Sequence, residues 1–106
     1  MELSAEQSYY AVIFTSKQTE DTSGYAEMAT KMEALAQKQP GYLGMEHARS
    51  ALGITISYWK TEAAIASWKN QVDHLVAQQT GKDKWYSAYS VRVCKVEREY
   101  HFDKEN

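Results

Sequence analysis

The side chain in this sequence best suited to acid–base chemistry is His74. An imidazole titrates near neutral pH, so it can accept a proton under physiological conditions. His74 lies away from the apolar stripe that the surrounding residues predict for their helix. A surface histidine with no catalytic task is an equally good interpretation of this position. His47 is a weaker candidate, because the strand predicted to contain it is partly exposed.

Arg92 is the candidate for holding an anionic group. A guanidinium donates paired hydrogen bonds that match the geometry of a carboxylate, and it can also hold a phenolate. The commoner outcome for an arginine on a strand is an ion pair within the protein. Glu46 and Glu97 are the carboxylates that the sequence offers for such a pair.

Four aromatic residues could form the wall of a binding site: Trp68, Trp85, Tyr86 and Tyr89. Trp68 shares a helical stripe with Ile65 and Val72, so packing in the core explains it as well or better. The other three could close a pocket and supply hydroxyl groups, or they could form a dimer interface. The chain has eight tyrosines and three tryptophans in 106 residues, which is more than packing alone usually requires.

The composition indicates one globular domain. A chain of 106 residues with 43% hydrophobic and 25% charged residues is typical of a soluble protein. A net charge of -2 without a basic cluster argues against nucleic acid as a partner. No apolar run is long enough to span a membrane, and the polar residues 1–7 do not resemble a secretory signal. We therefore expect a cytoplasmic protein with no membrane partner.

Cysteine and histidine usage argues against a metal site. Cys94 is the only cysteine, which excludes an intramolecular disulfide and fits a reducing compartment. The three histidines, His47, His74 and His101, do not have the spacing of metal ligands. There is also no glycine-rich phosphate loop and no dinucleotide fingerprint. We expect neither a metal nor a bound cofactor.

The clearest structural signal is a strand-to-helix junction that ends near Trp68. Alternating apolar residues predict a strand over residues 54–59. Thr61 is suited to cap a helix, and the apolar residues that follow it recur at helical spacing. We expect this helix to break near Asn70 and Gln71. Gly81 could equally be a C-cap that ends the helix before a separate short turn at residues 84–86.

The other elements complete a β-α-β-β-α-β order. Strands are predicted over residues 9–16, 42–50 and 89–98, and a helix capped by Thr22 or Ser23 ends near Gln39 before Pro40 and Gly41. This order is typical of a ferredoxin-like α+β fold, in which an antiparallel sheet carries both helices on one face.

The first strand is apolar on both of its faces. Tyr9, Ala11 and Ile13 alternate with Tyr10 and other apolar residues, so each face has its own apolar row. One layer of helices covers only one face of a sheet. We therefore expect a homodimer in which the two sheets pack face to face.

These elements carry residues that resemble the antibiotic biosynthesis monooxygenase family. The resemblance runs from residue 9 to residue 101 and is strongest over residues 56–98, with residues 1–8 as a lead-in and residues 102–106 as a charged tail. The matching positions are Ser57-Tyr58-Trp59-Lys60, Ala64-Ile65, Ser67-Trp68-Lys69, His74, Gln78, Gly81, Trp85-Tyr86, Tyr89, Arg92-Val93 and Val96-Glu97-Arg98.

The resemblance implies a dimeric α+β barrel with a cavity between the sheet and the helices of each subunit. It also implies a cofactor-independent monooxygenase that oxidises a polyphenol or quinol-type aromatic. Such an enzyme takes the phenolic proton, holds the anion and excludes water. His74 would be the base, Arg92 would hold the anion, and the four aromatic residues would form the wall.

Two other functions stay open. The same aromatic residues would serve a dimer that binds a small hydrophobic molecule without catalysis. Haem degradation is the weaker alternative, because the haem-ligating histidine of those family members falls at Gln78 in this chain. Their catalytic asparagine falls near Ile13 or Phe14. His74 as a substitute ligand would be displaced by one helical turn, about 6 Å.

Overall fold

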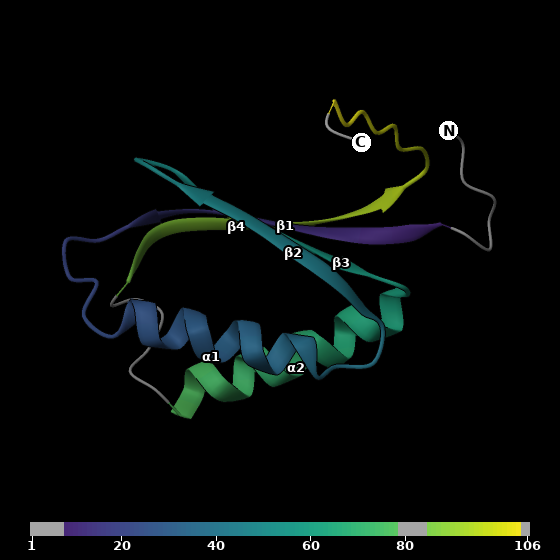
Figure 1. The fold of residues 1–106 in the computed structure, drawn as a ribbon. Helices are drawn as coiled ribbons and strands as arrows, with labels where there is room; N and C mark the ends of the chain where they lie inside the picture. The colour runs from purple at the N-terminus through teal and green to yellow at the C-terminus, as the bar shows by residue number, and fades with distance from the viewer. Residues whose placement is uncertain (1–7, 79–84, 105–106) are drawn as a thin grey trace.

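The computed structural model describes residues 8–78 and 85–104, and for residues 74–78 it describes the backbone only. The elements follow the expected β-α-β-β-α-β order (Figure 1): β1 (Tyr9–Gln18), α1 (Tyr25–Gln37), β2 (Tyr42–Arg49), β3 (Gly53–Trp59), α2 (Glu62–Gln78) and β4 (Tyr86–Val96). Most of the predicted lead-in and the last two residues of the predicted tail lie outside the described residues.

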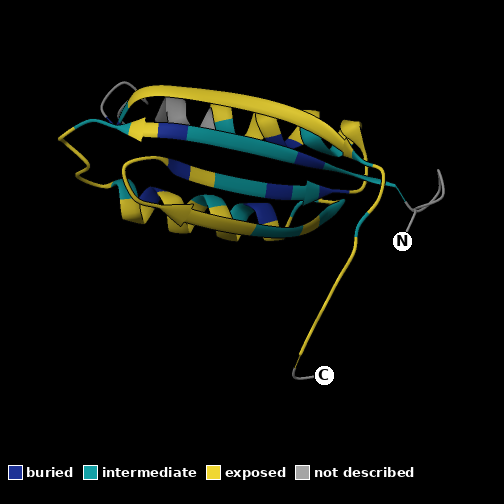
Figure 2. Cartoon of the chain, turned by 90° about the horizontal axis from the view of Figure 1, so that it is seen from above, coloured by how far each residue is buried: buried dark blue, intermediate teal, exposed yellow. Residues whose placement is uncertain are grey.

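The four strands form one antiparallel sheet in the order β2-β3-β1-β4. Both helices lie on one face of this sheet, and no helix or strand of the described residues covers the other face (Figure 1). The predicted ferredoxin-like α+β fold is therefore confirmed. The central strands β1 and β3 are mostly buried or half-buried, whereas the edge strands β2 and β4 are largely exposed (Figure 2).

The register of the sheet sorts side chains onto two faces. Val12 pairs with Ser57 and Val93, and it packs against the core between the sheet and the helices. We call this side the helix face. Ile13 pairs with Ile56 and lies on the opposite side, which we call the open face.

The hydrophobic core lies between the helices and one end of the helix face. Trp59 is fully buried, and its ring stacks on Trp68 of α2 at a centroid distance of 5.6 Å. The indole N–H of Trp59 donates to Ser57 Oγ at 2.9 Å, so its polar atom is satisfied inside the core. The junction predicted from the sequence thus joins the sheet to the helix that covers it.

The start of α1 differs from the prediction. The helix has no side-chain cap, and Gly24 precedes it in a left-handed conformation with φ of 79°. The predicted cap, Ser23, instead donates from its backbone N–H and its hydroxyl to Asp21 Oδ1. A left-handed residue costs least when it is glycine, so the backbone turn at Gly24 sets this boundary.

The helix α2 starts as predicted and continues further than predicted. Thr61 Oγ1 accepts a hydrogen bond from the Ala64 N–H at 3.0 Å, which confirms the cap. The expected break at Asn70 and Gln71 is wrong, because α2 runs without interruption to residue 78. The stripe that packs on the core extends from Ile65 to Val72, across the expected break. Tertiary packing of that stripe outweighs the weak helix preference of the two amides.

The start of β4 also corrects the prediction. Tyr86 belongs to the strand and pairs with Gln18, three residues before the predicted start at Tyr89. The predicted turn at residues 84–86 is therefore wrong at Tyr86. The register of β4 shifts between Lys17 and Gln18, and this irregularity brings both tyrosines to the helix face. In the parts of the chain that the structure describes, neither helix is long and apolar enough to cross a bilayer.

Candidate functional site

A cluster of aromatic and polar side chains gathers on the helix face, at the end of the sheet away from the Trp59 core. We call it the helix-face cluster. It combines residues from all four strands or their flanks and from α1: Phe14, Ser16, Tyr25, Arg49, Gly53, Trp85, Tyr86 and Tyr89. The chain thus brings together residues up to 75 positions apart, from Phe14 to Tyr89, whose rings stack.

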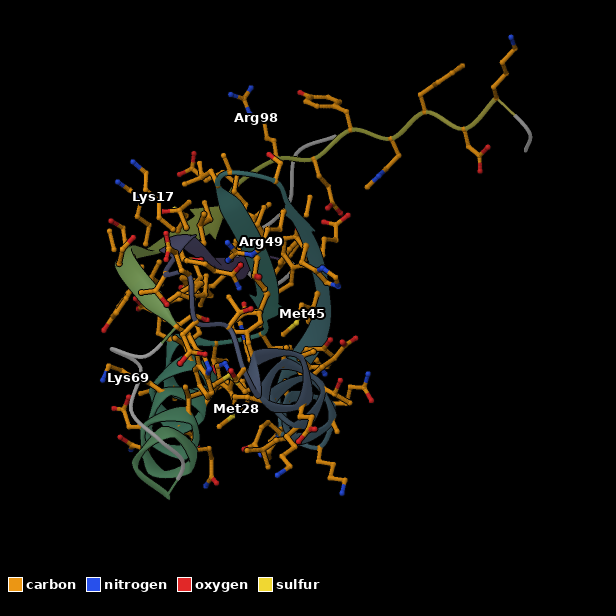
Figure 3. The ribbon with its side chains drawn as sticks, turned by 90° about the vertical axis from the view of Figure 1, so that its left-hand side faces the viewer. Lys17, Met28, Met45, Arg49, Lys69 and Arg98 are labelled. Carbon is orange, nitrogen blue, oxygen red and sulfur yellow. The ribbon has the colours of Figure 1, made fainter. Side chains whose placement is uncertain are left out.

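Arg49 is the only cation in this cluster, and two contacts fix its position. Its Nη2 donates to Ser16 Oγ at 2.5 Å, and Ser16 is only 1% exposed. Its Cζ lies 5.8 Å from the centre of the Tyr25 ring, within the range of a cation–π contact. Figure 3 shows Arg49 at the level of the sheet, above the helices.

Gly53 provides the space that Arg49 occupies. The two residues are a register pair on β2 and β3, and Ser16 pairs with Gly53 on the other side. A Cβ atom on Gly53 would lie 2.1 Å from both Cζ and Nη2 of Arg49. The guanidinium therefore crosses β3 directly over the glycine to reach β1, which no larger residue would permit without displacement.

The hydroxyl groups of Tyr25 and Tyr86 meet beside Arg49. Tyr86 Oη donates to Tyr25 Oη at 3.3 Å, and the two rings meet edge to face at 5.8 Å. Burial raises the pKa of the Tyr86 hydroxyl well above its usual value of 10, and the bond to Tyr25 raises it further. The charge of Arg49 acts in the opposite direction. Tyr86 is therefore a neutral hydrogen-bonding group and not a base.

Trp85 anchors the loop before α1 to the cluster. It is 4% exposed, and its indole N–H donates to the Ser23 carbonyl at 2.8 Å. Its own carbonyl accepts from the Thr19 N–H, also at 2.8 Å. The ring also meets Tyr25 edge to face at 6.0 Å. Trp85 thus holds Tyr25 in place at the edge of the cluster.

Phe14 and Tyr89 form the accessible aromatic surface of the cluster. Their rings stack at 5.4 Å, and Tyr86 meets both rings within 5.9 Å. Tyr89 is 43% exposed, so a flat ligand can reach this surface. Stacked and edge-to-face rings of this kind offer an aromatic ligand further favourable contacts.

The structure brings together three of the six residues singled out from the sequence. Trp85, Tyr86 and Tyr89 lie in the cluster, whereas Trp68 packs on Trp59 in the core at the other end of the sheet. Arg92 pairs with Ile13, so it lies on the open face, away from the three.

His74 lies in α2, but its side chain is outside the described residues. On this continuous helix it follows Ile65 by nine positions, which places its Cα about half a turn round the axis from the packed stripe. Gln78 and Gly81 also lie outside the residues whose side chains are described.

The residue that the sequence reasoning missed is Arg49. The structure places Arg49 on the same face of β2 as Met45, which packs on the core. The available signal was Gly53 directly across the β2–β3 turn. A glycine opposite a long cationic side chain permits that side chain to cross its strand.

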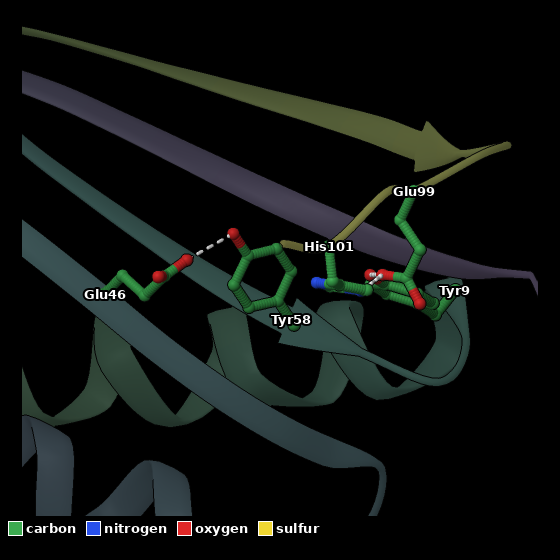
Figure 4. A network of polar contacts seen from close by, with 5 residues as sticks. All are labelled: Tyr9, Glu46, Tyr58, Glu99 and His101. Atoms are coloured by element: carbon green, nitrogen blue, oxygen red, sulfur yellow. Dashed lines mark hydrogen bonds and ion pairs between the residues drawn. The ribbon is translucent and has the colours of Figure 1, made fainter. Parts of the chain in front are cut away.

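The open face carries a second polar network, which Figure 4 shows from close by. Tyr58 Oη donates to Glu46 Oε1 at 2.6 Å, and Tyr9 Oη donates to Glu99 Oε2. His101 Nε2 lies 3.6 Å from the same Glu99 oxygen. These residues line a depression of about 490 Å³ whose floor is apolar and consists of Ala11, Ile13, Ile56 and Val96.

The carboxylates set the electrostatics of this second network. The hydrogen bond to Glu99 raises the pKa of Tyr9 to about 12, and the bond to Glu46 raises that of Tyr58. The same bond from Tyr9 lowers the pKa of Glu99. The depression is therefore acidic, and it favours a cation or a neutral surface over an anion. Within residues 8–78 and 85–104, no three potential ligands gather to hold a metal ion.

Comparison with known proteins places this chain beside a bacterial relative. It is 46% identical over 101 residues to the uncharacterized protein YqjZ of Bacillus subtilis, and the match covers 93% of this chain and 89% of that protein. The chain belongs to the YqjZ family. No family model matches the sequence.

Solved structures show the fold to which this YqjZ-family chain belongs. SnoaB of Streptomyces nogalater, a cofactor-independent oxygenase, aligns with a TM-score of 0.69 at 11% identity over 87% of this chain and 95% of its own. A candidate antibiotic biosynthesis monooxygenase of Nitrosomonas europaea aligns with a TM-score of 0.66 at 14% identity over 94% and 97% of the two chains. The predicted resemblance is thus confirmed at the level of the fold, which this chain shares with both proteins.

A haem-degrading protein has the same fold. MhuD of Mycobacterium tuberculosis, with two haems bound in its active site, aligns with a TM-score of 0.65 at 15% identity over 87% of this chain and 99% of its own. Proteins with this fold therefore differ in their chemistry, so the residues of the site must decide the function.

Proposed function

We propose that this YqjZ-family chain is a cofactor-independent monooxygenase that oxidises a phenol or quinol-type aromatic bound against the helix-face cluster. The observation that carries the proposal is the position of Arg49. Its guanidinium is held on Ser16 beside a surface of aromatic rings, and within the described residues it has no carboxylate partner.

The chemistry follows from the charge of that guanidinium. A phenol reacts with oxygen through its anion, because the anion gives up an electron more readily than the neutral form. A cation beside the bound oxygen atom stabilises the anion and lowers the pKa of the substrate, so only a weak base is needed. Arg49 retains N–H groups beyond the one that it donates to Ser16, so it can hold this anion.

The oxygenation balances with molecular oxygen as the only oxidant. The carbon that is oxidised lies para to the phenol oxygen and is a CH2 group in the keto tautomer of the substrate. This carbon reacts with O2 to give a ring C=O, so that the phenol becomes a quinone, and one molecule of water. The substrate supplies the electrons, and one oxygen atom remains in the product. The neutral hydroxyls of Tyr25 and Tyr86 would orient the substrate by hydrogen bonding, and Phe14 and Tyr89 would stack on its rings.

His74 stays the proposed proton acceptor, in the role that its residue type suggests. Because its Cα lies about half a turn from the packed stripe of α2, it would take the proton through water and not by direct contact with the substrate. A neutral imidazole is able to take the phenolic proton. The fold shared with SnoaB supports an oxygenase scaffold, but the similarity at 11% identity carries no assignment of residues.

We also propose that the functional unit is a homodimer in which the open faces of two copies pack together. The open face has an apolar floor around Ile13 and Ile56, and within residues 8–78 and 85–104 no helix or strand covers it (Figure 1). A second copy would bury this surface, as the two layers of a sandwich do.

Haem is the weaker alternative, and the cluster does not fit it. MhuD binds haem on this fold, yet the helix-face cluster contains no histidine, cysteine or methionine, which are common axial ligands. We therefore derive no step through haem. A titration with haemin should give no Soret shift, and a saturable shift would restore this alternative.

Oxygen uptake tests the proposal directly. Wild type, Arg49→Gln and Arg92→Gln would each be incubated with a panel of quinols and anthrones in an oxygen electrode. We expect wild type to accelerate uptake over buffer, Arg49→Gln to lose about a hundredfold in rate, and Arg92→Gln to stay near wild type, since Arg92 lies on the other face. Tight binding without acceleration for any substrate would favour a non-catalytic binding protein.

A further inference from the structure

The C-terminal segment, residues 97–104, begins on the open face and then leaves the body of the protein. Its start is fastened to β1 by the hydrogen bond from Tyr9 to Glu99, and Glu99 also contacts His101 within the segment. Beyond this point the chain extends away from the sheet as an exposed strand-like arm (Figure 2). The arm therefore starts at the surface where the proposed partner would lie.

Two aromatic side chains on this arm are almost fully exposed. Tyr100 is 75% exposed and Phe102 is 88% exposed, more than any other large hydrophobic residue of the described chain. They alternate with Glu99 and His101, which line the depression, so they project from the other side of the extended chain. A single exposed aromatic residue is ordinary, but a pair on one projecting arm is typical of a contact surface.

We infer that this arm is an intersubunit clamp: Tyr100 and Phe102 of each copy pack on the other copy of the chain, at the rim of its open face. The inference rests on the homodimer proposed above and adds the segment that holds it together. The partner is a second copy because the arm leaves the body at the open face, within reach of whatever covers that face.

The charges of the open face support a second copy as the occupant. Glu46 lies on this face on the edge strand β2, and Arg92 lies on it on the opposite edge strand β4. Arg98 also projects from the side of the sheet away from the helices (Figure 3). Within the described residues neither arginine forms an ion pair.

A two-fold axis parallel to the strands makes these charges complementary. It places β4 of one copy over β2 of the other, so the arginine edge of each subunit faces the Glu46 edge of its partner. The same operation carries the arm that follows β4 toward the partner's β2 edge. The positions of Tyr100 and Phe102 and the charges of Arg92 and Glu46 thus favour the same dimer, with its two-fold axis parallel to the strands.

Photo-cross-linking of the purified full-length protein tests the clamp. A benzoylphenylalanine placed at Phe102 should yield a covalent dimer on irradiation. The same probe at Lys31, which is exposed on α1 on the far side of the molecule, should yield almost none. If wild type sediments as a dimer but the Phe102 probe gives only monomers, the clamp is wrong and the dimer stands. If wild type sediments as a monomer at micromolar concentration, both are wrong.

A second experiment measures what the aromatic pair contributes. The double variant Tyr100→Ser and Phe102→Ser should raise the dimer dissociation constant at least about tenfold, because buried aromatic residues are the usual hot spots of interfaces. Val91→Ser is the matched control, since Val91 is 53% exposed but lies on the helix face. An unchanged dissociation constant in the double variant would overturn the clamp.

Discussion

Both faces of the sheet carry hydrogen-bonded tyrosines, but the tyrosines lie beside a cation on the helix face and beside carboxylates on the open face. On the helix face, Tyr25 and Tyr86 share a hydrogen bond beside the guanidinium of Arg49. On the open face, Tyr9 and Tyr58 each donate to a carboxylate. The cation on the helix face attracts an anionic ligand. The carboxylates that accept hydrogen bonds from the tyrosines on the open face repel one. The partners of the tyrosines, and not the tyrosines themselves, decide which face binds an anion.

The largest loss of activity is expected when Arg49 is displaced without a change in its charge. Gly53→Val inserts a side chain where the guanidinium crosses β3, since even a Cβ would lie 2.1 Å from it. We expect kcat/KM for a phenolic substrate to fall about a hundredfold, because misplacement of a charge-stabilising group costs nearly as much as its loss.

The matched control for this variant is Gly44→Val. A Cβ at Gly44 meets nothing within 4 Å, and Gly44 lies on the open face, where it pairs with Tyr58. Its kcat/KM should stay within a few-fold of wild type. Equal losses in the two variants would mean that β-sheet distortion, and not the position of Arg49, explains the effect.

Removal of the Tyr86 hydroxyl should have a smaller effect. Tyr86→Phe deletes the donor to Tyr25 and keeps the ring that packs on Phe14. We expect KM to rise several-fold and the free energy of unfolding to fall by about 1 kcal/mol, the usual contribution of one hydrogen bond. Steady-state kinetics and urea denaturation measure the two effects, and an unchanged KM would exclude a role in orienting the substrate.

The smallest effect is expected on the open face, and it depends on pH. The pKa of Glu99 is lowered in the folded state by the bond from Tyr9, so its contribution to stability is present above the unfolded value of 4.5 and is lost as the pH falls. The pKa of Tyr9 is raised from 10 to about 12, so its contribution is present below pH 10 and is lost as the pH rises toward 12.

The Glu99→Gln variant measures how much the ionised Glu99 carboxylate contributes to stability. The thermal midpoints of variant and wild type should differ at pH 7 and converge as the pH falls below 4. Oxygen uptake at pH 7 should be unaffected, since Glu99 is remote from Arg49 in the sheet order. A constant difference across the acid range would show that the Tyr9–Glu99 bond is not the cause.

Much of the fold was predictable from local signals. The Thr61 cap, the Pro40-Gly41 stop and the alternation in β3 each act within a few residues, so the element order follows from them. The boundary errors arose where tertiary contacts override local preference. The stripe of α2 continues over Asn70 and Gln71, and β4 begins at Tyr86 because pairing with Gln18 holds it in the strand.

The site was only partly predictable, because it depends on which strands are neighbours. Tyr86 and Tyr89 were identified by type, and the sheet brings them together as expected of one strand. Arg92 was selected as a strand arginine that could hold an anion, and Arg49, which also lies on a predicted strand, was not considered for that role. The register decides between them: Arg92 pairs with Ile13 on the open face, whereas Arg49 pairs with Gly53 on the helix face. No spacing within one strand contains that information.

The central claim is that Arg49 makes the helix face a site for anionic aromatic ligands. Isothermal titration calorimetry with 2-hydroxy-1,4-naphthoquinone, which is ionised at pH 7, and its neutral methyl ether tests it in wild type and Arg49→Gln. We expect wild type to bind the anion about tenfold or more tightly than the ether, and Arg49→Gln to lose that preference while it still binds the ether. Equal affinity of wild type for the two ligands, or a preference for the anion that survives in Arg49→Gln, would contradict the claim.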